Sequence, residues 1–209
     1  MKRSLLILLL LTFYVSANAQ DFKFGLTASP GFAWLKPDTE GLESDGSKIA
    51  FSYGIMGDFN FADNYAFATG IEVAYNGGKI INRDTAVALT GAVTNFNLQY
   101  IELPVTMKMK TNEIGYLTYF GRFGFVPGYL IGAKGETDIA GTVTEIPDFE
   151  DDINKFNVSL LIGAGAEYSL SGETALVASV TFKNGFLDVI DGGSKAVANV
   201  IALNIGVLF

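Results

Sequence analysis

The chain has 209 residues and a formal net charge of −8, and it contains no histidine and no cysteine. These counts exclude disulfide bonds, metal sites built from thiolate or imidazole groups, Ser-His-Asp catalysis, and a basic surface for nucleic acid. We therefore expect no enzyme, no cofactor and no nucleic-acid partner.

Residues 1–19 have the pattern of a cleaved secretory signal peptide. Lys2 and Arg3 precede an apolar stretch over residues 5–15, and Ala17 and Ala19 place small residues at positions −3 and −1 of a cleavage site. No later apolar run approaches the roughly 18 residues that a transmembrane helix needs. We predict an exported single domain over residues 20–209.

From residue 22 onward, apolar and polar side chains alternate with a period of two, which is typical of strands. The pattern predicts strands at about 22–34, 49–61, 65–76, 95–110, 116–131, 156–169, 174–184 and 198–209. Short turns at 61–64, 111–115 and 170–173 alternate with long connections at 36–48, 77–94, 132–155 and 185–197. This rhythm indicates an all-β fold, an eight-stranded antiparallel up-and-down β-barrel.

The alternation fits two kinds of barrel, because it does not say which face meets water. A soluble lipocalin-like barrel would turn its apolar face inward around a ligand, whereas a transmembrane barrel turns that face to lipid. The polar face carries small residues, the strand charges share its parity, and aromatic residues lie toward the strand ends of the apolar face. These features favour a transmembrane barrel of the outer membrane, surrounded by lipid, with its long loops outside the cell.

Seven charged residues of the polar parity form the candidate site. They are Asp58, Glu72, Glu102, Lys108, Arg122, Glu167 and Lys183. A turn at 111–115 would place Glu102 opposite Gly124 and one inward position from Arg122, so we expect a carboxylate–guanidinium contact there. The network could form a gate or proton path, or it could fill the lumen and neutralise its own charges; we favour the second.

The predicted strand 95–110 contains two irregularities. The polar parity inverts at Tyr100-Ile101, either because a β-bulge lies there or because the first part of the strand stands above the bilayer. Pro104 lies within the strand on the inward parity and cannot donate a ladder hydrogen bond. A local break in the strand is therefore expected.

The connection 132–155 contains an acidic segment, 145–152. Carboxylates can bind Ca²⁺, but this segment lacks the glycine and the spacing of a calcium loop, so we interpret it as a solvated loop. Ile146 and Phe149 within it are expected to offer a contact point for a protein partner.

The stretch Tyr100 to Lys108, YIELPVTMK, resembles the Y-x-E-(L/I)-P-x-x-(L/M)-K stretch of the PorT-like outer-membrane β-barrel family of Bacteroidetes. The resemblance implies an outer-membrane barrel whose terminal Phe209 is an assembly signal for the barrel-assembly machinery. It leaves two functions open: a structural or interaction barrel with long extracellular loops, and an accessory component of type IX-like secretion or transport.

Overall fold

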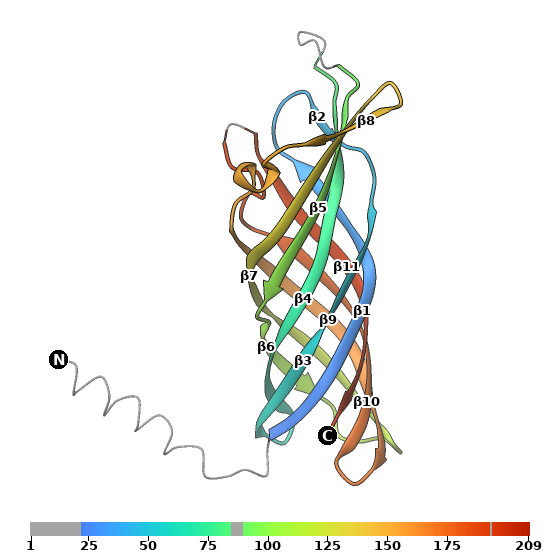
Figure 1. Ribbon diagram of the computed structural model, residues 1–209. Helices are drawn as coiled ribbons and strands as arrows, with labels where there is room; N and C mark the ends of the chain where they lie inside the picture. Colours follow the sequence, from blue (N-terminus) through green and yellow to red (C-terminus); the bar gives the residue numbers. More distant parts are fainter. Residues whose placement is uncertain (1–21, 85–89, 193) are drawn as a thin grey trace, which may run out of the picture.

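The computed structural model describes residues 22–84, 90–192 and 194–209, and these residues are mostly in strands (Figure 1). The predicted signal peptide, 1–19, lies outside the described residues. The elements are β1 (Phe22–Pro37), β2 (Leu42–Ser44), β3 (Lys48–Ala62), β4 (Tyr65–Asn82), β5 (Val93–Glu102), β6 (Val105–Lys110), β7 (Leu117–Ile139), β8 (Thr142–Ile146), the 3-10 helix η2 (Phe149–Asp152), β9 (Phe156–Ser171), β10 (Thr174–Gly185) and β11 (Ala196–Leu208). None of the helices within the described ranges is long and apolar enough to cross a membrane.

The strands close into an antiparallel ring. Around it run β1, β3, β4, β5 with β6, β7, β9, β10 and β11, and β11 pairs with β1 from Gly25–Leu208 to Pro37–Ala196. Closure pairs every strand of the ring on both sides, so the ring itself has no open edge. The predicted eight-stranded up-and-down barrel is confirmed, with β5 and β6 together forming the predicted fourth strand.

The break between β5 and β6 falls at Leu103-Pro104, as the proline predicted. Pro104 has no N–H to donate, and the N–H of Leu103 donates to the carbonyl of Pro127 on β7 at 2.9 Å. The prediction of a local irregularity in this strand is therefore confirmed.

Three of the predicted long connections, 36–48, 77–94 and 132–155, are partly strand, so their prediction as loops is wrong, and the first of them contains β2. β4 continues to Asn82 and pairs with β5, while β7 continues to Ile139 and pairs with β8. Pairing satisfies the backbone polar groups of these extensions above the ring. The alternation failed to indicate them because their outward side chains are polar instead of apolar.

The inversion of the polar parity at Tyr100-Ile101 reflects a change in what surrounds β5, and not a change in which of its residues face inward. Even-numbered residues of β5 face inward throughout, so Phe96, Leu98 and Tyr100 are buried just as Glu102 is. The register also shifts here, because Gln99 pairs with Gly132 while Tyr100 pairs with Leu130. The predicted irregularity is present, with its extra residue, Ile131, on the facing strand β7, and the outward residues of the upper part of β5 are polar; the position of this part above the bilayer stays a prediction.

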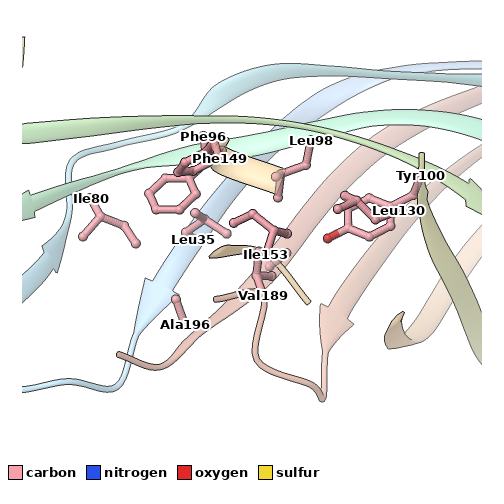
Figure 2. Close-up of a cluster of buried hydrophobic side chains, with 11 residues drawn as sticks. Leu35, Ile80, Phe96, Leu98, Tyr100, Leu130, Phe149, Ile153, Val189 and Ala196 are labelled. Carbon is pink, nitrogen blue, oxygen red and sulfur yellow. The ribbon is translucent and has the colours of Figure 1, made fainter. Parts of the chain in front are cut away.

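The upper interior of the barrel is an apolar cluster, here named the mouth plug. Its members are Leu35, Ile80, Phe96, Leu98, Tyr100, Leu130, Phe149, Ile153, Val189, Ala196 and Ala198. Figure 2 shows the Phe149 ring beside Phe96, and their ring centroids lie 5.3 Å apart. The segments after β8 and β10 meet above the barrel, where Ile153 forms an isolated bridge with Ile190.

Phe149 is buried in this plug, so the prediction that it is an exposed contact point is wrong. Its ring occupies the space above Gly135, where a Cβ atom would lie only 2.4 Å from the ring. Phe149 has acidic residues on either side, so the sequence alone suggests an exposed side chain. In the structure, its side chain points inward from η2.

The outer face of the ring is mostly apolar below the strand extensions. Aliphatic side chains such as Leu26, Ile55, Ile71 and Leu203 are exposed in the middle of this face. Exposed aromatic side chains lie toward one end or the other, among them Phe22, Phe59, Tyr65, Tyr168 and Phe209 at the end with the short turns and Phe51, Tyr75, Tyr129 and Phe156 toward the long extensions. An aliphatic band between two aromatic belts is the pattern of a lipid-facing surface.

Candidate functional site

The structure brings the seven charged residues of the candidate site to the lumen, each from a different strand. Asp58 lies on β3, Glu72 on β4, Glu102 on β5 and Lys108 on β6. Arg122, Glu167 and Lys183 follow on β7, β9 and β10. The period-two alternation is the cause, because each residue has the inward parity of its strand.

Lys108 joins two carboxylates across the lumen. Its ammonium group lies 2.6 Å from Asp58 Oδ2 and also forms an ion pair with Glu167 Oε1, and the Lys108 side chain is only 4% exposed. The same ammonium group lies 4.3 Å from the centroid of the Phe120 ring, a cation–π contact. Because β3, β6 and β9 are not neighbours in the ring, these contacts connect separate parts of the wall.

Lys183 and Glu102 form a second buried pair nearer the mouth plug. Lys183 Nζ lies 2.5 Å from Glu102 Oε2, and Asn76 Nδ2 donates to Glu102 Oε1 at 3.2 Å. Glu72 accepts a hydrogen bond from Ser52 Oγ at 2.9 Å. The carboxylates of this layer therefore have charged or polar partners that offset their loss of water.

The predicted contact between Glu102 and Arg122 is wrong. Glu102 pairs with Gly128, four positions beyond the predicted Gly124. The connection between β6 and β7 is longer than predicted, because Lys110 pairs with Phe120 and the residues between them form their own tight turn.

Arg122 instead pairs across the sheet with Lys108. In the part of the chain that the structure describes, its Nε atom is buried without a hydrogen-bond partner. Glu72 and Asp58 are the carboxylates that act on its charge through space.

The same interior contains a neutral polar group that was not predicted from the sequence. Ser29 Oγ donates to Asn204 Oδ1 at 2.9 Å, and Asn204 Nδ2 donates to Thr181 Oγ1 at 2.8 Å. All three side chains are buried. Their inward parity on β1, β10 and β11 is the signal in the sequence that could have found them.

Little open space is left within this polar layer. Two cavities border the Glu102–Lys183 pair, with volumes of about 20 Å³ and 10 Å³. The larger is lined by Glu72 and Arg122 as well. Such volumes accommodate about one water molecule each. Side chains therefore fill the lumen beneath the mouth plug.

Across the described ranges, no group of three or more acidic side chains is placed to hold a metal ion. The acidic segment 145–152 forms the end of β8 and the 3-10 helix η2, with Asp148 in the left-handed region at φ 53°. Its acidic residues flank Phe149 in the sequence, while the Phe149 ring itself packs in the mouth plug.

Comparisons with known proteins identify outer-membrane barrels. The model of the family described as outer membrane protein beta-barrel domain matches residues 11–191. A comparison with curated proteins gives no match. Among solved structures, the outer membrane protein OprG from Pseudomonas aeruginosa is similar over 90% of this chain and 95% of its own, with a TM-score of 0.50 and 11% identity. Neisserial surface protein A (NspA) is similar over 90% of this chain and 97% of its own, with a TM-score of 0.49 and 13% identity.

Proposed function

The chain belongs to the outer membrane protein beta-barrel domain family and is located in the outer membrane, and from this premise we propose that it is a closed barrel with a structural and interaction role. The family and the apolar outer face decide between the two barrels that the alternation left open, in favour of the transmembrane one. The role itself is the subject of the proposal.

Two layers of side chains, the charged layer and the mouth plug above it, close the interior, and this supports the proposed role most directly. The charged layer spans the lumen through Lys108 and Lys183, and the mouth plug covers it with apolar side chains. A conducting pore needs a continuous aqueous path, and a barrel of eight strands has room for side chains only. The charge network accordingly serves to fill and neutralise the lumen.

The interaction role lies in the strand extensions above the ring, which we place outside the cell. β8 pairs only with β7 among the described strands, so one of its edges is open, and Val143 on it is 59% exposed. Glu136 and Glu145 stand directly opposite each other in this hairpin. Like charges at opposite positions are destabilising by themselves, and a basic segment of a partner would relieve that repulsion.

Single-cysteine crosslinking in intact cells tests the role, since the chain has no native cysteine. Val143→Cys, labelled with a membrane-impermeant photocrosslinker, should give a discrete adduct with another protein. Asp63→Cys, in the short turn after β3, is the matched control and should stay unlabelled until the cells are opened. Labelling of the Asp63 variant alone, or Val143 labelling without any adduct, would overturn the proposal.

A second candidate function is an accessory role in secretion or transport of the type IX kind. The stretch from Tyr100 to Lys108 favours it, because this stretch carries the PorT-like resemblance and contains the break at Leu103-Pro104. Deletion of the gene followed by proteomics of the secreted fraction separates the two candidates. Loss of type IX cargo would support the accessory role, and an unchanged secreted fraction would support the structural and interaction role.

Phe209 is proposed as the signal for the barrel-assembly machinery. Its backbone pairs with that of Phe24, where the Phe209 N–H donates to the Phe24 carbonyl at 2.7 Å, and its ring stays exposed on the outer face. A terminal aromatic side chain at this position is accessible from the periplasmic rim before the ring closes.

A further inference from the structure

A depression interrupts the outer wall at the upper edge of the apolar band. It has a volume of about 310 Å³, and its lining includes Lys48, Ile49, Tyr75, Asn97, Gln99 and Lys134. Gly132 also lines it, and at this position β7 has no side chain to fill the space. The side chains of Tyr75, Asn97 and Lys134 in this lining are exposed and face outward, and the lining also includes Asn76 and Leu98 of inward parity.

The depression coincides with a gap in the upper aromatic belt. Across the sheet, Phe51 pairs with Tyr75, Tyr75 pairs with Gln99, and Gln99 pairs with Gly132. The first two positions at this level are aromatic, whereas the next two are an amide and a glycine. Aromatic side chains favour the boundary between hydrocarbon and head groups, so their absence leaves room for a polar group at that depth.

Donors surround this gap. Lys48 Nζ donates to Asn97 Oδ1 at 2.5 Å and to the Phe96 carbonyl at 3.4 Å, which leaves the third ammonium proton for another acceptor. Lys134 lines the depression from the opposite side, and Lys79 acts electrostatically on Lys48 from nearby. Gln99 Nε2 donates to the hydroxyl oxygen of Tyr75 at 3.1 Å.

Glu150 and Glu136 are carboxylates near these ammonium groups, and Lys134 also lines a neighbouring depression with Glu145, Asp148, Glu150 and Asp151. Glu150 lines the depression, but its Oε1 accepts a hydrogen bond from the N–H of Ala133 at 3.2 Å. Glu136 acts on Lys48 through space. Among the charged residues that line the depression itself, Lys48 and Lys134 outnumber Glu150.

We propose that this depression binds the anionic, phosphate-bearing head group of an outer-leaflet lipid. Lys48 and Lys134 would contact the phosphate oxygens as point charges, and the acyl chains would lie along Ile49, whose side chain is 84% exposed, and Tyr75 below. A lipid, rather than free phosphate, is the occupant because the polar depression continues directly into the apolar band. The placement of this end in the outer leaflet rests on the proposed topology.

Native mass spectrometry of the purified full chain, released from detergent micelles, tests the proposal. The probes are phosphatidylglycerol, phosphatidylcholine and inorganic phosphate. The wild-type protein should retain one phosphatidylglycerol in preference to phosphatidylcholine, and inorganic phosphate should not displace it. Lys134→Gln should weaken retention about tenfold, which corresponds to the loss of one charge-assisted contact.

The control is Lys195→Gln, which removes an ammonium group beyond this depression and should leave retention unchanged. Lys48→Gln is a second test, and its folding is verified by heat-modifiable migration on gels because Lys48 also holds Asn97. Equal retention of phosphatidylcholine, displacement by inorganic phosphate, or the same loss in the Lys195 variant would each refute a head-group site here. These readouts do not depend on any protein partner, so they can fail while the proposed interaction role stands.

Discussion

Replacement of Lys183 by methionine should destabilise the barrel by about 3–5 kcal/mol, because it leaves Glu102 charged, buried and without its ammonium partner. Both side chains of this pair are at most 10% exposed, so water replaces the lost partner only with rearrangement. Glu102→Gln should cost about as much, since it leaves Lys183 unpaired. The double variant should cost much less than the sum, because it leaves no buried charge without a partner, and the glutamine amide oxygen can still accept the hydrogen bond from Asn76.

The resulting coupling energy should be roughly 2–3 kcal/mol in a double-mutant cycle. Urea unfolding in lipid vesicles can be followed by the fluorescence of Trp34, the single tryptophan of the chain. Trp34 stacks on Phe182 at 6.1 Å between ring centroids on the outer side of the wall, whereas the next residue, Lys183, faces the lumen, so the signal reports unfolding of the ring. A coupling energy below about 0.5 kcal/mol would show that the pair acts independently and would refute the reasoning from burial.

Three further predictions concern the two faces and the plug. Ile162→Arg should lower the free energy of unfolding in vesicles by about 2–4 kcal/mol, because Ile162 is 55% exposed on the lipid face. A cysteine at 162 should react with a lipid-soluble probe, while a cysteine at 161 should not. The opposite labelling pattern would show that the lipid face and the lumen face of this strand are exchanged. Phe149→Ala should destabilise the barrel by about 3–5 kcal/mol, because it leaves a cavity in the mouth plug. Planar-bilayer recordings of this variant should still show no conductance, because the charged layer lies beneath the plug. Open channels would contradict the proposed role of the charged layer. Deletion of Phe209 should lower the yield of heat-modifiable barrel in the outer membrane without changing the level of unassembled chain, and normal assembly would exclude it as a signal.

The sequence determined the architecture because a barrel wall repeats one local rule. Period-two alternation specified the eight strands of the ring and the face of their side chains, and these follow from the geometry of a single strand, whereas β2 and β8 were not indicated. The polar parity likewise indicated which charged residues enter the lumen. Pro104 indicated the break in the fourth strand, since a missing N–H is a local property.

The register of the strands, that is, which residues lie opposite each other, could not be predicted from the sequence. The pairing of Glu102 with Gly128 depends on the length of the connection that ends at Phe120, and the tight turn inside that connection extends it. An error in the length of one turn shifts every residue pair between the two strands that the turn connects. The ion-pair partner of Glu102 is Lys183 from the far side of the ring, which no single turn determines. Such contacts are determined by closure of the whole barrel.

The burial of loop side chains in the mouth plug also could not be predicted from the sequence. Phe149 lies among acidic residues, and its segment is typical of a solvated loop when read alone. Only the fold brings it over Gly135 and against Phe96, where its ring is buried. The alternation of a strand is a local consequence of backbone geometry, whereas burial of a loop side chain depends on which distant segments surround it, and that is decided by tertiary structure alone.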